Sequence, residues 1–153
     1  MDLKFRVFGR IARPVVEVFE AVADPAKLSG YFTTGGARGR LVTGATVTWD
    51  FADFPGAFPV EVVEVVENAR IVLRWGDNQS GADGGERIRT EVTMTFTDTG
   101  DGRTLVEISE SGWRDTQAGL DASYGNCMGW SQMLCAMKAW VERGINLREG
   151  MYK

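Results

Sequence analysis

Residues 92–113, VTMTFTDTGDGRTLVEISESGW, contain two runs in which apolar and polar side chains alternate. A period of two is typical of a strand that buries one of its faces. Between the runs, segment 98–102 (DTGDG) contains the Asp and Gly residues of a tight turn. The stretch therefore predicts two antiparallel strands with a shared buried face made of Val92, Met94, Phe96, Val106 and Ile108.

The same alternation precedes this stretch, so strand follows strand between residues 41 and 111. Turn residues separate the runs at Asn68 and Ala69 and in the glycine-rich segment 77–85. Segment 62–66 (VVEVV) breaks the alternation, which indicates a β-bulge and leaves the direction of Glu64 open. The further inward positions are Val47, Trp49, Phe51, Ile71, Leu73 and Trp75.

Three short elements are expected before residue 41. Residues 3–11 alternate like a strand, and the apolar positions after Pro14 repeat at three and four, which predicts a short helix ending at Asp24 and Pro25. A second short helix is expected over residues 26–32. The glycine-rich segment 35–39 is expected to be a loop, and it lacks the lysine of a phosphate-binding loop.

The last third of the chain changes period. Trp130, Met133, Leu134, Met137 and Val141 fall on one face of a helix, and Ala136 falls on the opposite side. This pattern predicts a long amphipathic helix. It leaves open whether residues 114–126 form a loop or the first helical turns, and the tail 148–153 is expected to be a frayed end without a periodic pattern.

Together these elements predict an α+β protein with the order β-α-α-β6-α. A helix with one apolar stripe must lay it on the apolar face of the only sheet available. We therefore expect a curved antiparallel sheet that wraps around the long C-terminal helix, with a gap between the two. The length of 153 residues fits a single domain over residues 1–153.

The composition excludes several classes of function. Lys and Arg total 17 against 21 for Asp and Glu, so the net charge is -4, and without a long basic run we expect no nucleic-acid partner. The absence of histidine removes the His-based nucleophile arrangements and zinc sites, and we expect no metal and no cofactor.

The cysteines and the apolar runs bear on the compartment. Cys127 and Cys135 lie too far apart on one predicted helix for a mutual disulfide. We therefore expect both to be small buried hydrophobic residues in a reducing compartment. No apolar run has the length of a signal peptide or a membrane span. We therefore expect a cytoplasmic protein that does not insert into membranes.

Several segments carry a resemblance to a known family, in the right order over nearly the whole chain: 11–14 (IARP), 18–25 (VFEAVADP), 62–65 (VVEV), 71–75 (IVLRW), 111–113 (SGW) and 129–130 (GW). The chain resembles the START-related lipid-transfer superfamily (SRPBCC), which has the helix-grip fold. Within it, the chain resembles the bacterial branch similar to the activator of the ninety-kilodalton heat-shock-protein ATPase. That branch typically has paired tryptophans where this chain has Gly30, Tyr31 and Phe32, and often a histidine where Glu110 stands. The ligand therefore need not be that of the relatives.

The inward apolar positions form an aromatic and methionine-rich set that suits a hydrophobic small molecule. Two arrangements are open: the side chains fill the space completely as a solid core, or they line a cavity. The resemblance implies a cavity. The candidate ligand-binding residues are Trp49, Phe51, Trp75, Met94, Phe96, Ile108, Glu110, Trp130, Met133 and Met137.

Glu110 is the one ionisable residue among these candidates. It continues the alternation of Val106 and Ile108, which places it on the apolar face near the end of its strand. A carboxylate there suits a hydrogen-bond anchor for a ligand or a general acid/base. It could equally bend into solvent or pair with an arginine. The resemblance also places Tyr31, Phe32 and Trp113 near the mouth of the cavity, as gate residues or as half-packed aromatics.

From these observations we expect a carrier or sensor for a hydrophobic or aromatic small molecule, either a monomer or a homodimer. One alternative is a cyclase-like or dehydratase-like enzyme in which Glu110, with Tyr31 or Tyr124, moves a proton. The other is an interaction module such as a chaperone regulator. It has weak support, because the eukaryotic chaperone activators carry a further N-terminal domain that we do not expect here. The expected outer face of the sheet also carries polar residues such as Arg74 and Glu107, with no apolar patch.

Overall fold

The computed structural model describes residues 1–76 and 89–153, so the expected turn over residues 77–85 lies outside the described residues. The elements follow the order β1 (Lys4–Ile11), α1 (Val15–Ala23), α2 (Pro25–Leu28), β2 (Gly36–Arg38), β3 (Thr46–Phe51), β4 (Phe54–Val66), β5 (Arg70–Gly76), β6 (Arg89–Asp98), β7 (Thr104–Ser111) and α3 (Gln117–Arg143).

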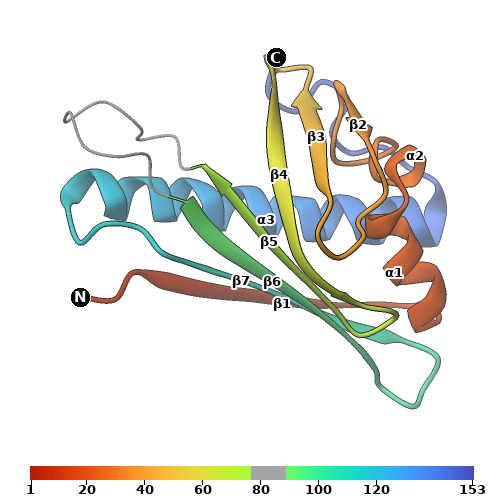
Figure 1. The fold of residues 1–153 in the computed structure, drawn as a ribbon. Coiled ribbons are helices and arrows are strands. Elements are labelled where there is room, and N and C mark those ends of the chain that lie inside the picture. The colour runs from red at the N-terminus through yellow and green to blue at the C-terminus, as the bar shows by residue number, and fades with distance from the viewer. Residues whose placement is uncertain (77–88) are drawn as a thin grey trace.

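The strands form one antiparallel, seven-stranded sheet in the order β1-β7-β6-β5-β4-β3-β2. Figure 1 shows this sheet curving across α3, which runs along one of its faces, while α1 and α2 lie together at one end. The predicted α+β class and the predicted element order are both confirmed. None of the helices in the described part is long and apolar enough to cross a membrane.

The two strands predicted from the opening stretch pair as expected. Val92 lies opposite Glu110, Met94 opposite Ile108 and Phe96 opposite Val106. All of these side chains are buried, because they share the face that packs towards α3. The turn between the strands uses Gly100 and Gly102, whose φ values of 80° and 82° favour glycine.

The predicted bulge is also confirmed. The register of β4 against β5 shifts between Val62 and Glu64. The shift leaves the Glu64 side chain 42% exposed, where it accepts a hydrogen bond of 2.7 Å from Arg70. Glu64 therefore belongs to the outer surface and not to the space between sheet and helix.

Two expectations for the N-terminal part were wrong. Residues 36–38 do not form a loop: they are the edge strand β2, paired with β3, so pairing with a neighbour outweighs the weak strand propensity of glycine. The second helix is shorter than expected. It begins after Asp24, whose side chain accepts hydrogen bonds from the backbone of Ala26 and Lys27, and it ends at Leu28.

Helix α3 begins well before the apolar stripe. Thr116 caps it by accepting a hydrogen bond of 3.0 Å from the Gly119 backbone, so most of residues 114–126 are helical. The helix ends at Gly144, in a left-handed conformation with φ of 68°. Ala136, expected on the exposed side, is fully buried, because α1 packs against α3 as well as the sheet does and so widens the buried arc. Cys127 and Cys135 are both free, but neither is buried as expected: Cys127 is partly exposed and Cys135 is exposed.

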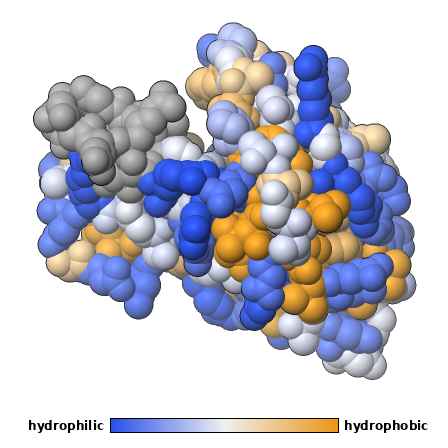
Figure 2. Space-filling model, in the orientation of Figure 1, coloured by the Kyte–Doolittle hydropathy of each residue, from blue (hydrophilic) through white to orange (hydrophobic). Residues whose placement is uncertain are grey.

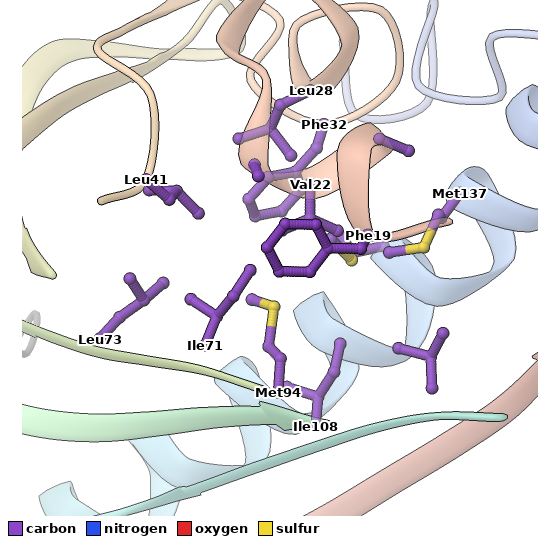
Figure 3. Packing of buried hydrophobic residues seen from close by; sticks show 14 of the residues in the cluster. Phe19, Val22, Leu28, Phe32, Leu41, Ile71, Leu73, Met94, Ile108 and Met137 are labelled. Carbon is purple, nitrogen blue, oxygen red and sulfur yellow. The ribbon is translucent and has the colours of Figure 1, made fainter. Parts of the chain in front are cut away.

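The main core lies between the sheet, α1 and α3. Figure 3 shows Phe19 of α1 surrounded by side chains from all three layers, among them Met94, Ile108 and Met137. Phe19 also makes an edge-to-face contact with Phe96, with ring centroids 5.5 Å apart. Burial of each side chain of this size contributes about 1.5–3 kcal/mol, so this cluster of buried residues is a main source of the stability of the fold.

Candidate functional site

A buried carboxylate lies where the sheet meets the first half of α3. Glu110 is 1% exposed, because the alternation of β7 directs it inward. Its oxygens accept hydrogen bonds from Trp130 Nε1 at 2.7 Å and from Trp75 Nε1 at 2.9 Å. They also accept from Thr90 Oγ1 at 2.7 Å and from Asn126 Nδ2 at 3.0 Å and 3.2 Å.

These partners come from three different elements, β5, β6 and α3. All of them are uncharged donors, and an indole N–H can only donate. Charge-assisted hydrogen bonds to a buried carboxylate are stronger than those between neutral groups. Glu110 therefore fixes the positions of two indole rings and joins the sheet to α3. It is neither exposed to solvent nor among the arginine-paired carboxylates of the described residues.

A pocket of about 400 Å³ opens beside this network, and we call it the sheet–helix pocket. A volume of this size is within the range of small-molecule sites. Phe54, which is 62% exposed, and Met128, which is 57% exposed, belong to its rim and place its opening at the surface. The aromatic part of its lining consists of Phe32, Phe51, Phe54, Trp75, Trp130 and Tyr152.

The aromatic wall is a continuous set of ring contacts. The Trp130 ring packs against Trp75 and Phe32, with centroid distances of 5.4 Å in both cases. Phe32 meets Phe51 edge to face at 5.1 Å. Because Glu110 holds both indole nitrogens, this wall has little freedom to collapse into the pocket.

Helix α3 provides the opposite wall, and two glycines lie in it. Gly125 and Gly129 are four residues apart and so share a helix face. A Cβ atom added at either position meets no atom within 4 Å. Glycine in a helix interior costs about 1 kcal/mol relative to alanine, and no close contact requires it here. The two glycines leave space that larger side chains would fill.

The tail after α3 closes one side of the pocket, contrary to the expected frayed end. Arg148 is 6% exposed, and its guanidinium lies over the rings of Phe32 and Tyr152, 5.2 Å from each centroid. Tyr152 donates a hydrogen bond of 2.5 Å to Gln132 Oε1 on α3. Tertiary contacts therefore order a segment that has no secondary structure.

The structure divides the sequence-derived candidates into two groups. Phe51, Trp75 and Trp130 line the sheet–helix pocket, and Glu110 lies behind the two indoles. The remaining candidates are buried in the core and do not line this pocket: Trp49, Met94, Phe96, Ile108, Met133 and Met137.

The three residues expected at the cavity mouth also separate. Phe32 lines the sheet–helix pocket. Tyr31 is fully buried, donates a hydrogen bond of 3.0 Å to the Ala21 carbonyl oxygen and packs against Trp140. Trp113 stacks on Phe5 with a centroid distance of 5.6 Å and is 6% exposed. Tyr31 and Trp113 therefore lie in packed surroundings outside the pocket lining.

Sequence reasoning missed several residues of the site. Thr90 continues the inward alternation of Val92 and Met94, and Asn126 precedes Trp130 by one helical repeat, so both carried a usable signal. Arg148 and Tyr152 carried no such signal, because they lie after the helix in a segment without a periodic pattern. In the described part of the chain, no cluster of three or more His, Cys, Asp or Glu side chains could hold a metal ion.

The outer face of the sheet is mostly polar. Arg74 pairs with Glu91 at 3.1 Å, and Glu107 accepts hydrogen bonds from Arg6 and Thr95. Figure 2 nevertheless shows hydrophobic residues gathered near the centre of the visible face, which differs from the expected lack of an apolar patch.

A protein-family model described as "Activator of Hsp90 ATPase homolog 1-like protein" matches residues 12–142. A search of curated proteins found no match.

Three of the solved structures that are similar to this chain illustrate the likeness. A Staphylococcus saprophyticus protein is 23% identical with a TM-score of 0.76, and the match covers 95% of this chain and 96% of that one. A putative protein in the dynemicin biosynthetic locus is 25% identical with a TM-score of 0.76, over 92% of this chain and 48% of that one. The Aha1 dimer from Colwellia psychrerythraea is 19% identical with a TM-score of 0.75, and the match covers 93% of this chain and 98% of that one.

Proposed function

The chain belongs to the family of Activator of Hsp90 ATPase homolog 1-like proteins, and from this premise we propose that it binds a hydrophobic or aromatic small molecule in the sheet–helix pocket. In this proposal the protein is a carrier or sensor and not a catalyst. A similar protein encoded in a biosynthetic locus is compatible with a small-molecule ligand. The structure described for Colwellia psychrerythraea is a dimer, so the proposal includes a homodimer as well as a monomer.

The observation that carries the proposal is the pocket itself. Its lining is largely aromatic, with Phe54 exposed and Phe51 and Trp75 partly exposed, and aromatic pairs contribute about 0.5–1.5 kcal/mol beyond their buried area. The opposite wall is kept open by Gly125 and Gly129. A side chain at either glycine would occupy the space that we assign to the ligand.

The surroundings of Glu110 favour the hypothesis of a binding protein over that of an enzyme. A general acid or base must reach the proton that it transfers, directly or through one water. The oxygens of Glu110 are engaged by Trp75, Trp130, Thr90 and Asn126, and Glu110 is absent from the pocket lining. We assign Glu110 the role of a positioning residue that holds the indole wall.

The cytoplasm is the compartment that we propose. Cys127 and Cys135 are both free, which suits a reducing environment. A regulatory contact with a chaperone has no support from the geometry of the pocket.

The test is a binding titration with 9-anthracenemethanol, a neutral polycyclic probe, followed by its fluorescence anisotropy. We expect saturable binding to the wild type and to Gly129→Ala, which adds one methyl group to the pocket. Gly129→Leu fills more of the space and should weaken binding about tenfold or more, which corresponds to about 1.4 kcal/mol. No binding of this probe or of its charged counterpart 9-anthracenecarboxylate by the wild type would contradict the proposal. Equal binding by wild type and Gly129→Leu would show that the probe binds elsewhere.

A further inference from the structure

Arg148 is the only charged side chain in the lining of the sheet–helix pocket as the described residues define it. It is 6% exposed, so more than nine-tenths of its surface is buried. Its guanidinium lies over the rings of Phe32 and Tyr152, which also line the pocket. The ring contacts fix the plane of the guanidinium and supply no oxygen acceptor to it.

The guanidinium lacks a partner. Its Nε atom is buried without a hydrogen bond, and within residues 1–76 and 89–153 no carboxylate lies within ion-pair distance of it. Burial lowers the pKa of the Arg148 guanidinium, and Tyr152 and Asp53 act in the opposite direction.

A largely buried cation without a counter-ion is costly, because burial removes part of its hydration and no carboxylate replaces the lost water. The same group becomes a strong binding element once an oxyanion reaches it, since charge-assisted contacts of arginine with carboxylates are short and often bidentate. The overall charge of the chain is -4, so attraction of an anion to this pocket would be local and not a consequence of net charge.

We propose that the ligand of the sheet–helix pocket is an aromatic or polycyclic oxyanion whose negatively charged group binds Arg148. This inference rests on the proposed function and names the chemical class of the ligand. The apolar body of the ligand packs on Phe51 and Trp75, which line the same pocket and are partly exposed. Glu110 lies behind Trp130, so its negative charge disfavours the reverse orientation, with the oxyanion near the indole nitrogens.

The experiment compares two probes with the same ring system, 9-anthracenecarboxylate and 9-anthracenemethanol, at neutral pH and constant salt. Binding is measured by fluorescence anisotropy with the full chain. We expect the wild type to bind the carboxylate at least about tenfold more tightly than the alcohol, because only the carboxylate forms a charge-assisted contact with Arg148.

Three variants assign the preference to Arg148. Arg148→Met keeps an unbranched apolar stem and should bind both probes equally, with affinity for the alcohol unchanged within about twofold. Arg148→Lys keeps the charge and should retain part of the preference. Arg103→Met removes one positive charge from the exposed turn between β6 and β7, where it pairs with Asp101, and should behave like the wild type. Thermal unfolding of each variant shows that it is folded.

The outcomes separate this inference from the proposed function. Equal binding of both probes by the wild type, or a carboxylate preference that survives in Arg148→Met, would overturn the role of Arg148 and leave the pocket as a neutral site. Failure of the wild type to bind either probe would overturn the proposed function and this inference with it.

Discussion

Trp130 donates a hydrogen bond of 2.7 Å from its indole nitrogen to the carboxylate of Glu110. The contact joins α3 to β7, and the same carboxylate also holds Trp75 of β5 at 2.9 Å. The two indole rings then form part of the pocket wall, so one buried charge determines the shape of an apolar surface.

Replacing Glu110 by glutamine should destabilise the protein by about 2–4 kcal/mol. The amide keeps one acceptor oxygen and turns its NH2 group either towards Trp130 Nε1 or towards Trp75 Nε1 and Thr90 Oγ1, and buried donors without acceptors cost about 1–3 kcal/mol each. Urea unfolding at neutral pH measures the change.

The matched control is Glu107→Gln, two residues earlier on the same strand. Glu107 lies on the outer face and pairs with Arg6 there, so its loss should cost less than about 1 kcal/mol. Equal effects of the two substitutions would show that the hydrogen bonds around Glu110 contribute no more to the free energy of unfolding than an ion pair on the outer face.

Gly125→Ala should stabilise the protein by about 0.5–1 kcal/mol. A methyl group at this helical position meets no atom within 4 Å, and alanine has the higher helix propensity. The midpoint of urea unfolding should rise at an unchanged slope. A lower midpoint would mean that the helix wall is packed more tightly than we describe.

Gly30→Ala should have the opposite effect and destabilise by about 1–3 kcal/mol. A Cβ atom there would lie 2.8 Å from ring atoms of Trp140, which is itself held against Tyr31. The same unfolding assay measures this change, and a variant as stable as the wild type would show that Trp140 can move at little cost.

Acid should remove a stabilising contribution from Glu20. The hydrogen bonds from Arg40 hold the pKa of this carboxyl below its ordinary value of 4.5, and the charge of Lys27 adds to the effect. A lowered folded pKa stabilises the protein above the ordinary value, and the stabilisation is lost as the pH falls through the folded pKa.

The matched variant for this prediction is Glu20→Gln. Its free energy of unfolding should be lower than that of the wild type at pH 7 by up to about 1 kcal/mol, as is usual for a partly exposed pair. Below the ordinary value of 4.5 the two curves should converge. A difference that is constant with pH would rule out this ion pair as its cause.

The fold could be predicted because strand and helix periods follow from backbone geometry alone. The alternation of Val106 and Ile108 was enough to place Glu110 on the inner face. Its donors could not be assigned in the same way, because they depend on the distance at which α3 packs on the sheet. Six apolar candidates point towards the inner face, as predicted, but are buried in the core. The alternation gives the direction of a side chain and does not show whether the space in front of it is filled.

Arg148 could not be found from the sequence for a different reason. The helix period ends at Gly144, and the position of the tail depends on its contacts with Phe32 and Gln132. Gly125 and Gly129 weaken the helical pattern in the sequence, and only the structure shows that they leave the pocket open. The expected loop at residues 36–38 is a strand because β3 offers it hydrogen-bond partners.

Native mass spectrometry of the full chain tests the central claim most directly. The freshly purified protein is compared with the denatured sample, and again after incubation with 9-anthracenecarboxylate. We predict a retained small molecule that is lost on denaturation, or uptake of one probe per chain that Gly129→Leu prevents. A mass without any ligand, before and after the incubation, would contradict a binding function for the sheet–helix pocket.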